Sequence, residues 1–309
     1  MPIRRFTKLT IEIVRYRTEI GRSLSNAGRQ IALASSLPQS KKGAYEPGGD
    51  LEHMATYFEE RYSSLGINTT RQRFSWRNLP QSNVIAILPG TQSGPPVILA
   101  DHYDTAVEED TYKRTKQRVT THGCDDNGTA TALLMQAAVA LKSKAHKRPI
   151  WLVHFTGEEF PSDGLGAWYF LSETMRAKQD IYAAVITDFI GWHAAGSPAY
   201  QINPTNTTVS ERYAAMALDA SKKIAPTLTA NYRPRNHARN SIFQTDIQEF
   251  EYYGIPGILI NENIDYTYAT NDNNPNYHQS SDVCANVNVP FATSLAKVVI
   301  ETTLRIADE

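Results

Sequence analysis

Carboxylates and histidines occur at several separate places in this chain, in types that bind metal ions and transfer protons. One such place is the loop at residues 123–128, Gly-Cys-Asp-Asp-Asn-Gly, which leads directly into an apolar helical pattern. Two adjacent carboxylates repel one another unless a positive charge offsets them, so a bound cation is one interpretation of this loop. The other interpretation is a solvated acidic loop in which one residue caps the helix.

Further polar side chains stand at the ends of apolar segments that we predict to be buried strands. His102 and Asp188 each follow one such segment, and the pair at 158–159, Glu-Glu, follows another. Because the carboxyl ends of parallel strands meet at one edge of an α/β sheet, we expect these side chains to converge. A later histidine, His278, completes the set.

The candidate metal ligands combine carboxylate and imidazole donors, which suit zinc and less often manganese or cobalt. They are His102, Asp126, Glu159, Asp188 and His278. Five such ligands exceed the needs of one tetrahedral site with an open position. They are about right for two ions that share one bridging carboxylate, as in two-metal hydrolases.

The motifs around these residues resemble those of the M28 zinc aminopeptidases, in the family's order, from about residue 50 to 308. Residues 102–104 (His-Tyr-Asp) are similar to its H-x-D motif, and residues 123–128 to its G-x-x-D-N-G loop. Residues 158–166 are similar to its E-E…G-L-x-G element, and residues 188–191 (Asp-Phe-Ile-Gly) to its D-M-I-G motif. Residues 245–256 and 277–282 are similar to S-D-x-x-x-F…G-I-P and Y-H-x-x-x-D. Six matches in register make the resemblance specific.

This resemblance implies a three-layer α/β/α fold with a mixed, mostly parallel sheet and two co-catalytic Zn²⁺ ions, with Mn²⁺ or Co²⁺ as substitutes. Asp126 is implied as the ligand that bridges both ions. His102 and Asp188 are implied to complete one site, and Glu159 and His278 to complete the other.

The resemblance also implies catalytic roles. Glu158 is implied as the general base that activates water, since a carboxylate can take a proton from water and pass it to the leaving amine. Asp104 is implied to fix the tautomer of His102, and Tyr277 to donate a hydrogen bond to the developing oxyanion. The implied substrates are peptides with a free N-terminus.

The chain departs from the family pattern at three points. Residues 160–163 are inserted after Glu159, Ala167 replaces a common serine, and Cys124 replaces a small residue. The insertion lies beside the expected active-site edge, so it bears on the substrate pocket more than on the metals.

Other functions remain open at this point. Glutaminyl cyclase-like relatives share several of these motifs and use one zinc for an intramolecular acyl transfer, although Asp-Asn-Gly at 126–128 and Tyr277 favour the peptidases. A carboxypeptidase or dipeptidase of the same family is a further alternative, and so is a non-catalytic interaction domain. The retention of all five ligands and Glu158 argues against the last of these.

The elements that position these residues follow from hydrophobic periodicity. Apolar strands alternate with helices from residue 83 onward, which predicts an α/β domain with a sheet covered on both faces. We predict helices at 8–33, 50–64 (capped by Asp50), 129–143, 164–176, 209–223, 246–253 and 290–306. We predict strands at 67–76, 83–88, 96–100, 149–155, 183–187 and 255–260. Residues 105–122 lack apolar periodicity and are predicted to be a surface loop. The expected division is a helical extension at 1–45 and a peptidase domain at 46–309.

Composition excludes some classes of function. The 309 residues carry a formal net charge of −1, so no overall attraction to nucleic acid or membranes is expected. There is no run of about 18 apolar residues that could span a membrane. We see no signal peptide as written, and the compartment and oligomeric state stay open.

Several residues have two interpretations. Cys124 and Cys284 flank two of the candidate ligand loops, so a disulfide between them is one possibility, decided by geometry. Asp125 is interpreted as a cap or a support for the ligands rather than a ligand. The run of cations at 233–239 is interpreted as a solvated loop or, alternatively, as a site for a substrate carboxylate. His154 is expected to be a hydrogen-bonded core residue.

Overall fold

One eight-stranded sheet forms the centre of the computed structural model, which describes residues 49–266 and 273–309. Its strands are β1 (Asn68–Trp76), β2 (Leu79–Leu88), β3 (Val97–His102), β4 (Ile150–Phe155), β5 (Ala183–Asp188), β6 (Ala199–Pro204), β7 (Thr229–Tyr232) and β8 (Gly257–Glu262). Their order across the sheet is β1-β2-β4-β3-β5-β8-β6-β7. The central strands β4, β3, β5 and β8 run parallel, whereas β2 and β6 join this core antiparallel.

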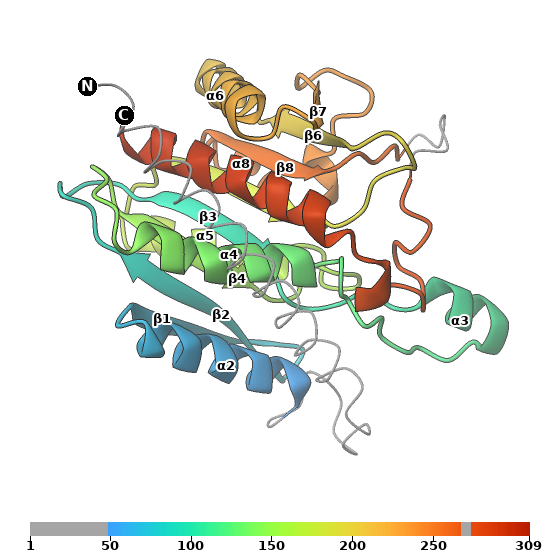
Figure 1. Cartoon of the computed structure of the whole chain (residues 1–309). Helices are drawn as coiled ribbons and strands as arrows, with labels where there is room; N and C mark the ends of the chain where they lie inside the picture. The colour runs from blue at the N-terminus through green and yellow to red at the C-terminus, as the bar shows by residue number, and fades with distance from the viewer. Residues whose placement is uncertain (1–48, 267–272) are drawn as a thin grey trace.

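Helices cover both faces of the sheet. They are α2 (Asp50–Ser64), α3 (Glu109–Thr115), α4 (Gly128–Leu141), α5 (Leu165–Arg176), α6 (Thr208–Ile224), α7 (Ile247–Tyr252) and α8 (Val289–Ala307), with short 3₁₀ turns η1 (Ile242–Gln244) and η2 (Cys284–Asn286). Figure 1 shows α4 and α8 in front of the sheet and α5 behind it. Successive strand residues point to opposite faces, so Val97 and Leu99 pack with α2, α4, α6 and α8, whereas Ile98 and Ala100 pack with α5 and α7. The predicted three-layer α/β/α architecture is confirmed.

The N-terminal part of the prediction lies outside the described residues. This applies to the helix expected at 8–33 and to the boundary between residues 45 and 46. The next helix, α2, matches its expected range, but the predicted cap is wrong. Gly49 is the N-cap residue, and Asp50 is already the first helical residue. Its negative charge there interacts favourably with the positive end of the helix dipole.

The strands β6 and β7 are absent from the sequence prediction. In β6 the residues Tyr200 and Ile202 point into the core, while Gln201 and Asn203 lie buried on the other face. These amides find partners from distant segments, since Gln201 donates to Ser241 Oγ and Asn203 donates to Asn261 Oδ1. Buried polar residues interrupted the apolar pattern, and only tertiary hydrogen bonds make such a strand stable.

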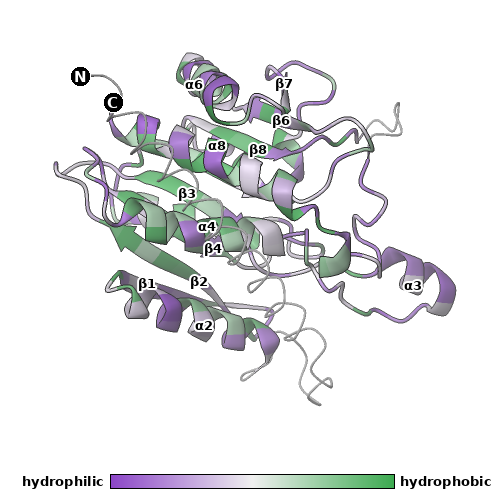
Figure 2. Cartoon of the chain, viewed as in Figure 1, coloured by the Kyte–Doolittle hydropathy of each residue, from purple (hydrophilic) through white to green (hydrophobic). Residues whose placement is uncertain are grey.

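The prediction that residues 105–122 form an irregular surface loop is wrong in part, because they contain helix α3. None of its residues is buried, so the helix shows no apolar period, and Figure 2 shows it largely hydrophilic against the hydrophobic strands. Charges support it instead. Glu109 and Asp110 lie in its first turn, Lys113 and Arg114 lie in its last, and Lys113 pairs with Glu109 at 3.1 Å.

His154 is a core residue, as expected. It is fully buried, its Nε2 lies 2.6 Å from the Tyr62 hydroxyl, and its Nδ1 lies 2.7 Å from Asp101 Oδ1. The ring of Phe58 stacks on the imidazole at 4.0 Å. These contacts join α2 to the ends of β3 and β4. None of the helices in the described ranges combines the length and apolar character that crossing a bilayer requires.

Candidate metal centre

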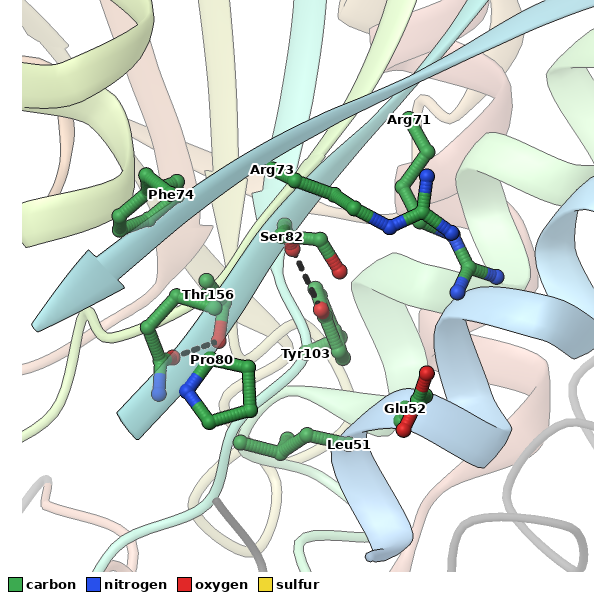
Figure 3. A pocket seen from close by; sticks show the side chains of 10 residues that line it. Leu51, Glu52, Arg71, Arg73, Phe74, Pro80, Ser82, Tyr103 and Thr156 are labelled. Carbon is green, nitrogen blue, oxygen red and sulfur yellow. Dashed lines mark hydrogen bonds between the residues drawn. The ribbon is translucent and has the colours of Figure 1, made fainter. Parts of the chain in front are cut away.

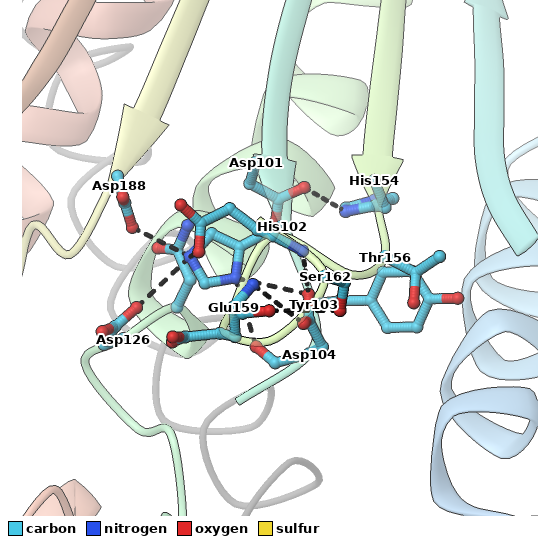
Figure 4. Close-up of polar contacts among 12 residues, drawn as sticks. Asp101, His102, Tyr103, Asp104, Asp126, His154, Thr156, Glu159, Ser162 and Asp188 are labelled. Atoms are coloured by element: carbon cyan, nitrogen blue, oxygen red, sulfur yellow. Dashed lines mark hydrogen bonds and ion pairs between the residues drawn. The ribbon is translucent and has the colours of Figure 1, made fainter. Parts of the chain in front are cut away.

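The carboxyl ends of three neighbouring parallel strands bring the first candidate ligands to one edge of the sheet. His102 is the last residue of β3 and Asp188 is the last residue of β5, while Glu158 and Glu159 follow β4. Figure 4 shows His102, Asp126 and Asp188 pointing toward one another. Ligands gather at this edge in α/β sheets because loops from several strands meet there.

Asp126 is shared by two groups of donor atoms. His102, Asp126 and Asp188 form one group, and Asp126, Glu159 and His278 form the other, with the donor atoms of each group within 4.8 Å of one another. Asp126 Oδ1 lies 3.3 Å from His102 Nε2, and Asp126 Oδ2 lies 3.3 Å from His278 Nε2. One carboxylate therefore faces a different histidine with each oxygen, as a bridging ligand must.

The loop that carries Asp126 is tied to the loop that carries His278. The carboxylate of Asp282 accepts hydrogen bonds from the backbone N–H groups of Asp125 and Asp126, at 2.8 and 3.2 Å. A disulfide joins Cys124 to Cys284, with their Cα atoms 5.0 Å apart. The disulfide that the sequence left as one possibility is therefore present. It links the loop that carries Asp126 to the segment that follows His278.

Removing this disulfide should lower the free energy of unfolding by about 2–5 kcal/mol, because it closes a long loop of 160 residues. We expect the variant with both Cys124→Ala and Cys284→Ala to show this loss in urea-induced unfolding under non-reducing conditions. Adding a reductant to the unsubstituted protein should reproduce most of the loss, and equal stability of the two proteins would contradict the prediction.

Asp104 positions the two glutamates. Its carboxylate accepts from the backbone N–H of Glu158 at 3.1 Å and from that of Glu159 at 3.2 Å. The hydrogen-bonding partner of His102 Nδ1, at 3.2 Å, is the main-chain oxygen of Asp104, whereas the carboxylate of Asp104 is 3.7 Å away. One short segment thus holds both His102 and the glutamate pair.

The electrostatics of the cluster fit a bound cation. Burial raises the pKa of Glu158 and of Glu159 well above the ordinary value, and neighbouring carboxylates raise both further. Burial opposes a charge on His102, but Glu158 and Asp188 outweigh it and raise the pKa of His102. Within the described part of the chain, the buried Glu159 Oε1 has no hydrogen-bond partner. Converging buried carboxylates of this kind are costly unless a positive ion offsets them, and oxygen with imidazole donors suits zinc.

The metal-free protein should therefore be more stable at about pH 5.5 than at about pH 8. Burial raises the pKa of Asp125 to about 6 and that of Asp282 to about 8. A raised carboxyl pKa contributes stability that is present below the unfolded value and is lost as the pH rises through the folded value. We expect a difference of about 2–3 kcal/mol in urea-induced unfolding with a chelator present.

The same measurement with zinc provides the comparison. Zinc should stabilise the protein more at the higher pH, because it offsets carboxylates that are then ionised. A metal-free protein that gains stability between the two pH values would contradict this account of the cluster.

The family model for "Peptidase family M28" matches residues 83–303, a span that contains every candidate ligand. The chain belongs to peptidase family M28. This membership confirms the resemblance inferred from the six motifs and supports a hydrolase. The curated relative "Uncharacterized protein YfbL" of Escherichia coli (strain K12) is 30% identical over 156 residues, which are 49% of this chain and 46% of that protein. The chain thus matches about half the length of this relative.

Solved structures of both enzyme classes share the fold of this M28 chain. The Legionella pneumophila LapA aminopeptidase superposes with a TM-score of 0.72 at 18% identity. The superposition covers 97% of this chain and 74% of the LapA chain. The Bacteroides thetaiotaomicron glutaminyl cyclase superposes with a TM-score of 0.69 at 15% identity, covering 93% and 97%. At these identities the likeness establishes the three-layer fold alone.

Tyr277 lies against His278, one of the candidate ligands of this M28 chain. Its ring stacks on the imidazole of His278 at 3.8 Å and meets the edges of Phe189 and Tyr266. Burial raises the pKa of Tyr277 well above its usual range, and the nearby Tyr266 and Asp126 raise it further. The hydroxyl therefore keeps its proton. A protonated hydroxyl at this position can donate a hydrogen bond.

Tyr103 lies between His102 and Asp104 in the H-x-D motif, but its side chain contacts residues away from the candidate ligands. Its hydroxyl donates to the Ser82 carbonyl at 2.5 Å, and burial raises its pKa to about 12. Figure 3 shows Tyr103 lining a small cavity with Arg71 and Pro80. None of the candidate metal ligands lines this cavity, which gives Tyr103 a packing role.

Asp125 supports the ligand loops and makes no helix cap. Its carboxylate accepts from the Gly191 N–H at 2.7 Å, from the Thr129 hydroxyl at 3.1 Å and from the Asn274 side chain at 2.9 Å. Glycine is required at 191, because a Cβ there would lie 2.6 Å from Asp125 Oδ1. This contact explains the glycine of the D-x-I-G motif.

Asp246 lies near the candidate site, and the sequence reasoning gave it no role. It is buried, and within the described ranges neither carboxylate oxygen has a hydrogen-bond partner. Burial raises its pKa, which His102 lowers and Asp104 and Asp188 raise, so it lies within electrostatic reach of the cluster. Its place in the Thr245-Asp246 motif was the available signal.

The basic run at 233–239 is held by protein acceptors. Arg235 pairs with Glu251 at 2.7 Å, Arg239 pairs with Asp265 at 3.3 Å, and Arg233 donates to Asn263 Oδ1 at 3.2 Å. These arginines fix their loop, which favours the structural interpretation over a site for a substrate carboxylate.

Proposed function

We propose that this chain is a di-zinc aminopeptidase that hydrolyses the N-terminal bond of peptides. The observation that carries the proposal is the carboxylate of Asp126, whose two oxygens face histidines of two different donor groups. A single ion would need only one of these groups. Two ions sharing one carboxylate use both.

The candidate ligands would hold two metal ions. His102 and Asp188 would hold one ion, Glu159 and His278 the other, and Asp126 both. Bound zinc supplies Lewis acidity, which lowers the pKa of water and polarises a carbonyl oxygen. Mn²⁺ or Co²⁺ would suit the same oxygen and nitrogen donors less commonly.

Glu158 is the proposed general base. Its Oε2 lies 3.9 Å from His102 Nε2, and its side chain is 12% exposed, so it borders the donor groups and still reaches the solvent. The hydrogen bond from its backbone N–H to the Asp104 carboxylate holds the main chain of Glu158 in place. Glu158 would take a proton from the attacking water and deliver it to the nitrogen of the leaving amine.

Other residues would bind and orient the peptide. The Tyr277 hydroxyl would donate to the oxygen that becomes negative during attack. Carboxylates around the centre would attract the positively charged N-terminal ammonium group. This attraction would restrict cleavage to the first peptide bond.

A glutaminyl cyclase is the alternative function. It shares the fold, and this chain and the Bacteroides cyclase each cover more than nine tenths of the other, as do this chain and the aminopeptidase of Aneurinibacillus sp. strain AM-1, so size does not separate the two functions. A cyclase with one zinc would leave half of the shared arrangement around Asp126 without a use.

Metal analysis combined with a substrate panel tests the proposal. The panel contains aminoacyl p-nitroanilides, unblocked dipeptides, their N-acetylated forms and peptides with N-terminal glutamine. Two equivalents of zinc with chelator-sensitive release from the unblocked substrates alone would support the aminopeptidase. One equivalent of zinc with cyclisation of glutamine and no hydrolysis would establish the cyclase instead.

A further inference from the structure

A pocket of about 360 Å³ opens beside the second donor group, with Glu159 and His278 in its wall. This volume falls in the range of sites for small ligands. Ala106, Val107 and Phe160 give it an apolar surface, and the Phe160 side chain is 65% exposed. A group of a substrate held at the metal ligands could extend into this pocket.

The segment around α3 forms one wall and is fixed to the loop of His278. The Glu109 N–H donates to the His278 carbonyl at 2.9 Å, and the Ser280 N–H donates to Asp110 Oδ1 at 3.0 Å. His278 itself has a left-handed backbone with φ of +56°, a conformation that needs support from its surroundings. The wall therefore keeps a constant position relative to the proposed ligand.

Arg118 is one of four charged residues in the wall of this pocket, beside Lys113, Glu109 and the proposed zinc ligand Glu159. Lys113, the other cation in the wall, pairs with Glu109 at 3.1 Å. Within residues 49–266 and 273–309, the Arg118 guanidinium has no carboxylate within 4.0 Å, and it lies over the Phe160 ring, 5.9 Å from its centroid. The backbone beside Arg118 is held by the Glu108 N–H, which donates to the Val119 carbonyl at 2.8 Å.

We propose that this pocket binds a carboxylate of the peptide substrate through Arg118, with the apolar stem of that group against Phe160. Arginine presents parallel N–H groups that match a carboxylate, and an aromatic ring beneath the guanidinium keeps it in place. The carboxylate has two sources, an acidic first residue or the C-terminus of a dipeptide. The inference rests on the proposed peptidase function.

Matched substrate pairs separate the two sources. Leu-Leu against Leu-Leu amide tests the terminal carboxylate, and glutamyl against glutaminyl p-nitroanilide tests the acidic side chain. In at least one pair we expect the acid to have a KM about five- to tenfold lower than that of its neutral partner. This factor lies between the typical effect of an exposed ion pair and that of a hydrogen bond to a charged group. Arg118→Gln should abolish the difference without slowing the neutral substrates. Arg114→Gln, which removes an exposed arginine of helix α3 outside the pocket, should preserve it.

Binding provides a readout that is independent of turnover. In the zinc-loaded Glu158→Gln protein, calorimetry should show the same five- to tenfold preference, lost with Arg118→Gln and kept with Arg114→Gln. Equal affinities within both pairs, or a preference that survives Arg118→Gln, would overturn the carboxylate site. Hydrolysis of neutral substrates without a preference for the acids would contradict the carboxylate site but still support the peptidase function. Binding that depends on Arg118 without hydrolysis of any substrate would leave the site standing and contradict the peptidase.

Discussion

Replacing Glu158 with glutamine should lower kcat for aminoacyl p-nitroanilides by about 10²- to 10⁴-fold, with the zinc content unchanged. Glutamine keeps the size of the side chain and the backbone bond to Asp104, but it cannot accept the proton of the attacking water. The measurement is kcat at saturating substrate, with zinc determined by emission spectrometry on the same sample.

The control for this experiment is Glu173→Gln, which removes a surface carboxylate paired with Arg176. It should leave both kcat and zinc content as they are. If Glu158→Gln retained full kcat with its metal bound, the assignment of the general base would be wrong. If it lost zinc as well, Glu158 would act as a ligand, consistent with its position near His102 and Glu159.

Replacing Asp126 with asparagine should remove both equivalents of zinc after dialysis and lower kcat/KM by at least about 10³-fold. Each oxygen of Asp126 faces a different donor group, so one substitution weakens two sites. Loss of the metals removes several kcal/mol of transition-state stabilisation, and each 1.36 kcal/mol is a factor of ten.

Substitutions at ligands outside the bridge give the comparison. Asp188→Asn should release zinc from the site of His102 alone, and Glu159→Gln should release it from the site of His278 alone. A stoichiometry that falls from two to one in these variants and to zero in Asp126→Asn would support a shared carboxylate. Equal losses in all three variants would contradict it.

The sequence by itself was sufficient for the architecture and for the location of the candidate site. Continuous apolar segments before His102, Glu158 and Asp188 predicted strands buried on both faces, and helical periodicity between them predicted parallel connections. Parallel strands place their carboxyl ends together, so these residues had to lie at one edge. That part depends on local patterns that every strand and helix carries in its own residues.

Contacts between distant segments decided the rest. Gln201 and Asn203 are stable in a buried strand because Ser241 and Asn261 supply partners, which no local window contains. The pairing of Cys124 with Cys284 depended on how two loops meet. The carboxylate of Asp104 was expected beside His102, where it lies 3.7 Å from Nδ1, but its hydrogen bonds from the backbone of Glu158 and Glu159 were not foreseen.

Helix α3 shows most plainly what only the tertiary structure could decide. Its exposed residues carry no apolar period, so the sequence indicated a loop. Its hydrogen bonds to His278 and Ser280 fix one wall of the pocket that Arg118 and the candidate ligands Glu159 and His278 also line. The sequence determined which residues can hold metal and move protons, because this ability lies in their chemical type. The structure determined which partners neutralise each charge, because that energy depends on distances that folding alone establishes.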